Sequence, residues 1–275
     1  MTKSLVRNKK EEGMKETVDL IVVNFNTKKL LAACLDSLRR FSGAPDTYRL
    51  WVVDNASTDG SVTLIRSLPW VTGIFNRENR GYATACNQGI KAGNAPYIFI
   101  LNSDTLVTEG WLPPLIAALQ DPAVAVVGPR LVSPDGYLVG AGVVGTETAP
   151  IIRGWGVPDD PALFAEPTAC LSICGACLGL KRALLPELGY FDENYFHYFE
   201  ETDYCYNARR HGYKVLYVPT SRVIHLVNGS CRNRRRLAAY FRQSKAYFDR
   251  KWQIGEGDHE QPAKTAVLGD DGRPE

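Results

Sequence analysis

The segment Asn102-Ser103-Asp104 is the part of this sequence that points most directly to chemistry. It follows the apolar run of residues 97–101, which is typical of a strand buried on both faces of a parallel sheet. Such a strand would place Asp104 at the carboxyl edge of the sheet, where open α/β sheets bind their ligands. A carboxylate there can hold a divalent cation, which in turn can hold a diphosphate. The alternative is that Asp104 caps the next helix.

Two earlier apolar runs also end in polar residues. Asn26 follows the first run, and Asp54 ends the second. If the strand ends converge, Asp54 can accept a hydrogen bond from a base or a ribose, and a metal-bound Asp104 can neutralise phosphate charge. The first strand-to-helix turn has no G-x-G-x-x-G pattern, and the sequence has no G-x-x-x-x-G-K-[ST] loop. The pattern therefore favours a nucleoside diphosphate over a nicotinamide or a P-loop ATPase site.

A third group of polar residues lies far along the chain. Glu200, Glu201 and Asp203 crowd three carboxylates at the start of a predicted helix. One explanation is favourable interaction with the helix N-terminus. The other is that neighbouring like charges raise the pKa of one carboxyl group and make it a better general base. The aromatic residues at 195–199 would form either a wall for stacking a sugar or part of the core.

The elements that must position these residues follow from the hydrophobic pattern. Strands are predicted at residues 18–25, 50–53, 71–75, 97–101 and 124–127, alternating with helices at 30–38, from 61, at 82–92 and at 111–119. This alternation predicts a parallel sheet with right-handed crossovers. Later segments predict short strands around 134–136, a long loop at 145–167, helices at 181–188, 201–211 and 237–252, and strands at 215–218 and 223–226.

Composition sets the class of protein. The 275 residues are 45% hydrophobic and 23% charged, which fits a soluble globular protein, and a net charge of +2 gives no support for nucleic-acid binding. No apolar run approaches the roughly 20 residues of a membrane span. Residues 1–16 and 255–275 are polar, so we expect a disordered leader and tail and, without a secretion signal, a cytoplasmic protein.

Seven scattered cysteines suggest free thiols. Cys170, Cys174 and Cys177 have a spacing like that of the iron–sulfur motif of radical enzymes. Their segment is small and apolar, however, and cysteine is among the most buried residue types. A buried strand and turn is the favoured interpretation.

Taken together, the ordered blocks of this chain resemble the inverting family 2 glycosyltransferases, which have the GT-A fold. The resemblance covers about residues 18–230. The matching blocks are residues 22–26 (VVNFN), 52–61 (VVDNASTDGS), 79–83 (NRGYA) with Asn87 and Gly89, 102–104 (NSD), 199–203 (FEETD) and His225.

The resemblance implies an α/β/α sandwich with a mostly parallel central sheet, spanning residues 17–254. Its nucleotide-binding half would be 17–128 and its acceptor-side half 129–254. The implied activity is metal-dependent, inverting transfer of a sugar from a UDP- or dTDP-sugar to an acceptor hydroxyl. Rhamnosyltransferase-like members of bacterial surface polysaccharide or glycolipid assembly are the nearest type. A sugar-nucleotide pyrophosphorylase and an inactive nucleotide-sugar-binding module remain alternatives.

The same resemblance implies roles for individual residues. Glu201 would be the catalytic base, and Asp104 and His225 would hold Mg²⁺ or Mn²⁺. The implied donor-binding residues are Phe25, Asn26, Asp54, Asn79, Gly81, Asn102, Ser103 and Asp104. The implied acceptor-side residues are Gly175, Ala176, Glu200 and Asp203. The chain departs from the family at Asn102, which replaces the first Asp of the D-x-D motif, and at Glu201, which is one methylene longer than the commoner Asp.

The expected partners are a nucleotide-sugar donor and a glycan or lipid-linked acceptor. A basic run at Arg232, Arg234, Arg235 and Arg236 precedes the aromatic last helix. It is either a solvated face or a surface that touches anionic lipid at the inner face of the membrane.

Overall fold

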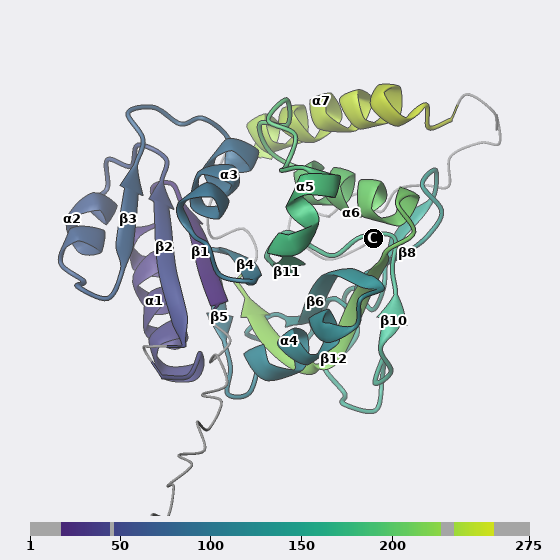
Figure 1. Ribbon diagram of the computed structural model, residues 1–275, viewed down its shortest axis with the longest axis horizontal. Helices are drawn as coiled ribbons and strands as arrows, with labels where there is room; N and C mark the ends of the chain where they lie inside the picture. The colour runs from purple at the N-terminus through teal and green to yellow at the C-terminus, as the bar shows by residue number, and fades with distance from the viewer. Residues whose placement is uncertain (1–17, 45–46, 227–233, 256–275) are drawn as a thin grey trace, which may run out of the picture.

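The computed structural model describes residues 18–44, 47–226 and 234–255 (Figure 1). The predicted leader, Arg232, and the predicted tail apart from Gly255 lie outside these ranges. The first part of the chain alternates strands and helices as predicted. Its elements are β1 (Val18–Asn24), α1 (Lys28–Phe41), β2 (Tyr48–Asp54), α2 (Ser61–Arg66), β3 (Thr72–Phe75), α3 (Tyr82–Ala92) and β4 (Tyr97–Asn102).

The second part is richer in short strands. Its elements are β5 (Thr105–Val107), α4 (Leu112–Gln120), β6 (Val124–Val132), β7 (Leu138–Gly140), β8 (Val143–Gly145), β9 (Pro150–Ile152), β10 (Thr168–Ala169), β11 (Cys177–Lys181), a 3₁₀ turn (Arg182–Leu184), α5 (Leu185–Leu188), α6 (Glu200–Arg210), β12 (Lys214–His225) and α7 (Arg234–Trp252). Two predicted strands are one here, because β12 runs on past a register shift between Val218 and Arg222. The predicted helix at 181–188 is wrong in its first turn, where Lys181 still pairs in the sheet.

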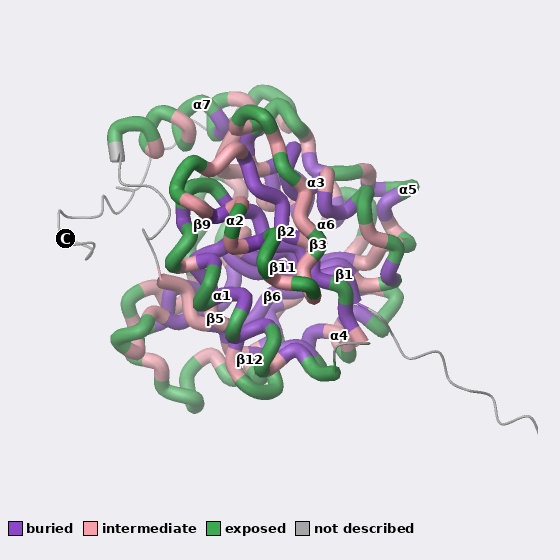
Figure 2. The backbone as a smooth tube through the Cα atoms, turned by 90° about the vertical axis from the view of Figure 1, so that its left-hand side faces the viewer, coloured by how far each residue is buried: buried purple, intermediate pink, exposed green. Residues whose placement is uncertain are grey.

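One sheet runs through the molecule in the order β10-β12-β6-β11-β4-β1-β2-β3. The strands β4, β1, β2 and β3 are parallel, as are β6 and β12, whereas β11 runs antiparallel between β4 and β6. Alternate side chains of β1 face opposite layers. Leu20 and Val22 pack with α1 and α4, and Ile21 and Val23 pack with α3, α5 and α6. The predicted α/β/α sandwich is therefore confirmed, and Figure 2 shows its buried interior.

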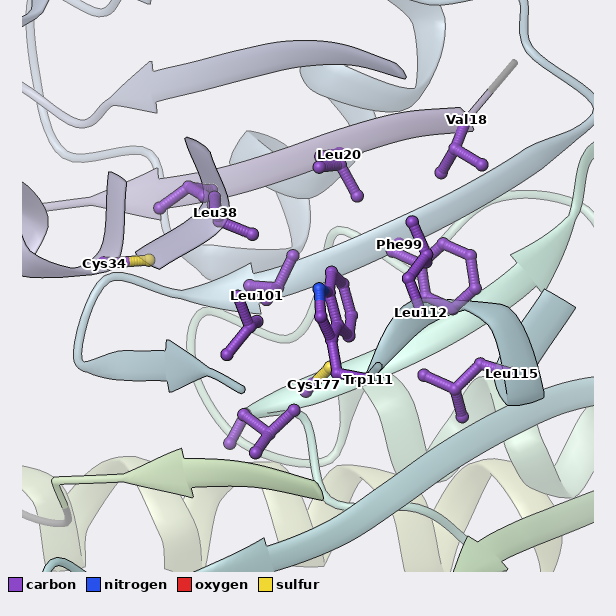
Figure 3. Packing of buried hydrophobic residues seen from close by; sticks show 14 of the residues in the cluster. Val18, Leu20, Cys34, Leu38, Phe99, Leu101, Trp111, Leu112, Leu115 and Cys177 are labelled. Carbon is purple, nitrogen blue, oxygen red and sulfur yellow. The ribbon is translucent and has the colours of Figure 1, made fainter. Parts of the chain in front are cut away.

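Trp111 is at the centre of the apolar layer that packs with α1 and α4 on one face of the sheet. Its indole is fully buried among Phe99, Leu101, Leu115 and Cys177 (Figure 3). The Phe99 and Trp111 rings meet edge to face with centroids 5.8 Å apart, a favoured arrangement for aromatic pairs. This packing holds the β4 strand, whose end carries the Asn102-Ser103-Asp104 segment.

Residues 145–167, predicted as one long loop, are partly ordered by pairing. β8 and β9 form a hairpin, and beyond it the Asp159 carboxylate is held by two arginines. The Arg130 Nε atom lies 2.6 Å from one Asp159 oxygen, and the Arg222 Nε atom lies 2.9 Å from the other. Arg130 also donates to the carbonyl oxygens of Asp160 and Leu163. The segment is therefore tied to β6 and β12.

The cysteines at 170, 174 and 177 are free thiols in the structure. Burial raises the pKa of Cys174 to about 11 and that of Cys177 further. Within the described ranges, no group of three or more His, Cys, Asp or Glu side chains is arranged to hold a metal ion. None of the helices described is long and apolar enough to cross a bilayer.

Candidate active site

The order in which strands are added to the sheet reverses at β1, which lies between β2 and β4. The first crossovers lead outward to β2 and β3, and the next leads back to the other side of β1. In an open α/β sheet, such a switch point leaves a crevice at the carboxyl ends of the two strands. Here the ends of β1 and β4 carry Asn26 and Asp104, so topology brings two of the predicted segments together.

A buried hydrogen-bond network fixes the floor of this region. The Asn24 side-chain amide donates to Asp54 at 2.7 Å and to the Ser57 hydroxyl at 3.1 Å. The Thr27 hydroxyl donates to Asn24 at 2.6 Å and lies 2.7 Å from the Ser103 hydroxyl. Because the bonds of Asn24 to Asp54 and of Thr27 to Asn24 and Ser103 are all buried, the turns after β1, β2 and β4 are held to one another.

Asp54 belongs to this network. Its side chain is fully buried, and its second oxygen accepts from the Ser57 backbone N–H at 2.8 Å. Asn26 and Ala56, on either side of this contact, have positive φ angles of 54° and 67°, a conformation that costs energy for residues other than glycine. In this structure Asp54 holds the turn and does not line the cleft described below; its contact with a pyrimidine stays a prediction.

A cleft lies over this floor. Its lining includes six residues predicted from sequence, namely Phe25, Asn79, Gly81, Asn102, Ser103 and Asp104. It also includes residues that the sequence did not single out for this site, namely Val23, Asn55, Tyr82, Phe196, His197, Arg236, Leu237 and Tyr240. The last three come from α7, so the C-terminal helix forms one side of the cleft.

Gly81 is where the cleft wall requires a glycine. Its φ is 85°, and a Cβ atom built there would lie 2.8 Å from the carbonyl oxygen of Phe196. That same oxygen accepts a hydrogen bond from the Tyr82 N–H at 2.7 Å. The Asn55 side chain donates to the Gly81 carbonyl at 3.0 Å and so joins this wall to the β2 end. Asn55 follows Asp54 directly, which is the sequence signal that would have found it.

Asp104 and His225 meet at the end of β4 and β12. The His225 Nε2 atom lies 3.3 Å from Asp104 Oδ1, and the Leu226 N–H donates to the Asp104 carbonyl at 2.9 Å. Asp104 Oδ1 and His225 Nδ1 are both buried without a hydrogen-bond partner among the described residues. A carboxylate oxygen left in this state beside an imidazole has the chemistry that would suit a divalent cation.

Two strained residues introduce the helix that carries the acidic group. Tyr198 and Phe199 have φ angles of 70° and 72°, and α6 begins at the next residue. Successive left-handed aromatic residues are costly, so the surrounding packing must impose them. The strained turn sets the direction in which Glu200 and Glu201 leave the backbone.

Glu201 lies beside the segment before β11. A Cβ atom built on Gly175 would stand 3.4 Å from the Glu201 Cδ atom, so the side chain of a larger residue at 175 would contact the carboxyl group. The Tyr82 hydroxyl donates to the Gly175 carbonyl at 3.2 Å, and the Asn102 N–H donates to Ala176 at 3.0 Å. Tyr82 thus links the cleft to the surroundings of Glu201.

Burial sets the electrostatics of the acidic pair. It raises the pKa of Glu201 and raises that of Glu200 well above its usual value, with the charge of Glu201 adding to the second shift. Glu200 is 4% exposed, and its Oε2 atom has no hydrogen-bond partner among the described residues. Burial also lowers the pKa of His197 to about 4, so this cleft residue is neutral at neutral pH.

Asp203, the third carboxylate, faces α7. One oxygen accepts from the Tyr195 hydroxyl at 3.0 Å and the Trp252 indole at 2.7 Å, and the other lies 2.9 Å from Lys251. With both oxygens engaged, Asp203 is not available as a general base in this structure. Its bonds hold the last turn of α7 against α6.

The aromatic segment at 195–199 packs mainly against α7. The ring pairs are Tyr195 with Tyr247, Phe196 with Tyr240, Tyr198 with Phe241, and Phe199 with Phe241 and Phe248. Of the two interpretations of this segment, packing describes Tyr195, Tyr198 and Phe199. Phe196 and His197 also contact α7, but they line the cleft as well.

Comparison with known proteins agrees with this geometry. The model of the family described as glycosyl transferase family 2 matches residues 19–189, more than half of the chain. This chain belongs to glycosyl transferase family 2. The family predicted from the sequence blocks is therefore confirmed.

Three similar proteins have printed names or titles that concern sugar transfer or nucleotide sugars. The N-acetylglucosaminyl-diphospho-decaprenol L-rhamnosyltransferase of Mycobacterium tuberculosis is 28% identical over 244 residues, which cover 77% of this chain and 76% of that protein. A mannosyltransferase from Pyrobaculum calidifontis, solved with GDP-Man and Mn²⁺, has a TM-score of 0.64 at 22% identity and covers 89% of this chain and 66% of its own. GalNAc-T7 with UDP, GalNAc and Mn²⁺ also gives 0.64, at 20% identity, covering 90% and 53%.

The two solved chains are too distant in sequence to show more than a shared fold, and this glycosyltransferase spans between half and two thirds of their lengths. That fold is GT-A, as the sequence predicted.

The buried Glu200 should make stability depend on pH. Because the native state raises its pKa, the native state binds the proton more tightly than the unfolded chain does. The contribution to stability is present below the unfolded pKa of about 4.3 and is lost as pH rises from there through the folded pKa.

Glu200→Gln should therefore raise the free energy of unfolding by about 1–3 kcal/mol at pH 8, the cost of an unpaired buried polar group, and by less at pH 4. Urea unfolding from pH 4 to pH 8 measures this difference, with Glu109→Gln as the exposed control; parallel curves for Glu200→Gln and the native chain would contradict it.

Proposed function

We propose that this family 2 glycosyltransferase moves a sugar from a UDP- or dTDP-sugar to an acceptor hydroxyl with inversion. The observation that carries the proposal is the arrangement around Tyr82. Tyr82 lines the cleft that Asp104 also lines, and its hydroxyl donates to the carbonyl of Gly175, which lies beside Glu201. Tyr82 therefore connects the proposed leaving-group site to the proposed general base.

Asp104 and His225 are the residues that would hold Mg²⁺ or Mn²⁺, since Asp104 Oδ1 is buried without a hydrogen-bond partner among the described residues and lies 3.3 Å from His225 Nε2. When bound, the ion would supply positive charge to the departing diphosphate. Two relatives in the same fold were solved with Mn²⁺, which supports this choice of cofactor.

Glu201 accepts the proton in this mechanism. The acceptor hydroxyl approaches from the Gly175–Ala176 side and transfers its proton to the Glu201 carboxylate while its oxygen bonds to the anomeric carbon. The bond from that carbon to the diphosphate oxygen breaks, and its electron pair leaves with the nucleoside diphosphate. The raised pKa of Glu201 brings this base closer to neutrality, where a general base acts most effectively.

The donor would lie along the cleft. We assign the base and ribose to the end of β1 and β2, near Phe25, Asn26 and Asp54, and the diphosphate to Asn102, Ser103 and Asp104. Asn79 supports the wall between them, because its side-chain oxygen accepts the Gly81 N–H at 3.0 Å. Asn102 donates its backbone N–H to Ala176, so the donor and acceptor sides share a backbone contact.

The acceptor side comprises Gly175, Ala176 and Glu200. Asp203 supports this side indirectly, because it binds Lys251 and Trp252 of α7. The mycobacterial relative is named for a diphospho-decaprenol-linked acceptor. By analogy, we propose a glycan or lipid-linked acceptor and a role in bacterial surface polysaccharide or glycolipid assembly. A pyrophosphorylase would release pyrophosphate and an inactive module would turn nothing over, whereas this proposal requires release of free nucleoside diphosphate.

We further propose a cytoplasmic protein that touches the inner face of the membrane. The exposed side of α7 carries Phe241, which is 44% exposed, next to the exposed Arg242 and Lys245. An aromatic side chain among cations is typical of helices that lie on anionic lipid. This position would bring a lipid-linked acceptor to the protein surface.

Asp104 should govern metal-dependent donor binding. A ligand that binds only the native state raises the melting temperature, so UDP or dTDP should do so, and more strongly with Mn²⁺ than with EDTA. Asp104→Asn keeps the size of the side chain but removes its charge, and it should abolish the Mn²⁺-dependent part of the shift. GDP serves as the competing nucleotide and Asp135→Asn, in an exposed turn, as the matched control. A full Mn²⁺ effect in Asp104→Asn would exclude this ligand.

Glu201→Gln should keep the fold and donor binding but lower transfer by about 10²–10⁴-fold, the usual worth of a positioned base. Because the base must be ionised, the native rate should fall as pH drops through a value above about 4.3, the ordinary pKa of Glu. Transfer rates at saturating donor, with Glu200→Gln and Asp203→Asn for comparison, measure the effect. A larger loss in Asp203→Asn would move the assignment away from Glu201.

The double variant Phe241→Ser, Arg242→Ala should weaken binding to vesicles that contain phosphatidylglycerol. Each cation near an anionic surface contributes about 1 kcal/mol, so we expect a loss of at least fivefold and a similar loss of native binding in high salt. Cosedimentation with phosphatidylglycerol and with pure phosphatidylcholine vesicles measures it. Lys29→Ala, an exposed cation on α1, is the control; equal binding by both variants would refute the α7 surface.

A further inference from the structure

α7 forms part of the wall of the cleft that Asp104 also lines. In Figure 1 the helix crosses above α3, α5 and α6, and its first turns reach the lining of the cleft. Arg236, Leu237 and Tyr240 stand there together with Asn102, Ser103 and Asp104. We propose that Arg236 binds the diphosphate of the donor and of the departing nucleotide. This inference rests on the proposed function and adds a residue from outside the predicted donor-binding set.

The charges around the cleft favour this role. The described residues that line the cleft include one carboxylate, that of Asp104, and one side chain of Lys or Arg type, that of Arg236. His197, which also lines it, is neutral at neutral pH. Asn102 stands where the family motif has a second carboxylate. A divalent cation on Asp104 leaves one positive charge, and Arg236 raises the total to two. That total balances the two negative charges of a nucleotide-sugar diphosphate.

The guanidinium group is positioned by its neighbours. Arg236 Nε donates to the Tyr240 hydroxyl at 2.7 Å, and the guanidinium carbon lies 5.4 Å from the centroid of that ring. Tyr240 packs in turn on Phe196, with ring centroids 4.9 Å apart. An arginine held in this way presents a planar fork of donors, the geometry that matches phosphate oxygens best.

Contacts along the rest of α7 hold Arg236 over the cleft. The Ser244 hydroxyl donates to the His197 carbonyl at 2.8 Å, and Phe248 is buried against Phe199. Lys251 and Trp252 are bound to Asp203. Because these contacts lie beyond the cleft, shortening the Arg236 side chain should leave the helix in place.

The neighbouring Arg235 provides a matched control. Both arginines are exposed and carry the same charge in the same turn, but Arg235 does not line the cleft. A general effect of positive charge on this helix would appear in Arg235→Ala and Arg236→Ala alike. A specific phosphate contact would appear in Arg236→Ala alone.

The experiment measures calorimetric dissociation constants of the full chain for UDP, UMP and uridine, and for the thymidine series. We expect Arg236→Ala to weaken the diphosphate by about 10–100-fold, the usual worth of hydrogen bonds to charged groups, while nucleoside binding stays unchanged. Arg236→Lys should lose less, and Arg235→Ala should match the native chain. The loss should persist in EDTA, because Arg236 does not act through the metal.

Three results would overturn the inference. Equal affinity of Arg236→Ala and native chain for the diphosphate would remove the contact but leave the proposed function standing. Equal weakening of diphosphate and nucleoside would show that Arg236 acts by holding α7. Failure of the native chain to bind any nucleoside diphosphate would end the proposed function and this inference together.

Discussion

The antiparallel pairing of β11 with β4 is the contact on which the rest of the site depends. Because the two strands run in opposite directions, the start of β11 meets the end of β4, with Cys177 opposite Leu101. The Gly175–Ala176 segment is thereby placed against Asn102. Because β11 also pairs with β6, it joins the parallel strands β1–β4 to β6 and β12 in one sheet, and it places the segment beside Glu201 next to the end of β4.

α7 makes a second connection of the same kind. Its contacts with Asp203 and with the aromatic residues at 195–199 tie it to the segment that leads into Glu201, and its first turn borders the cleft over Asp104. A displacement of this helix would therefore be felt at both ends of the site. That coupling is a packing effect, since interlocked aromatic rings in a dense interior shift together.

The site also concentrates unfavourable features that the fold must offset. The backbone is in left-handed conformation at Asn26, Ala56, Tyr198 and Phe199, and the Glu200 Oε2 atom is buried without a hydrogen-bond partner among the described residues. Each costs on the order of 1–3 kcal/mol. They cluster at the turns after β1 and β2 and before α6, where chemistry needs fixed positions, while the strands behind them are continuous hydrophobic core.

The order of residues was enough to predict the fold and several members of the site. Apolar runs predicted the first four strands, and apolar residues at helical spacing predicted the first three helices. The two can be told apart because side chains repeat differently along a strand and along a helix. Strand ends followed by Asn102-Ser103-Asp104 and by Asp54 indicated the ligand edge. The short β5 and the single β12 were not predicted, because their pairing partners are far away in sequence. The hairpin of β8 and β9 was not predicted either, although its two strands are close in sequence.

The sequence could not predict which polar and aromatic side chains are engaged within the protein and which line the cleft. Asp54 and Asp203 look like Asp104 in the sequence, yet they are engaged within the protein, whereas Asp104 keeps a buried oxygen unpaired. Arg236 looks like Arg235, but one lines the cleft and the other faces solvent. These differences arise because hydrogen-bond partners and neighbours are fixed by long-range packing, which local patterns do not encode.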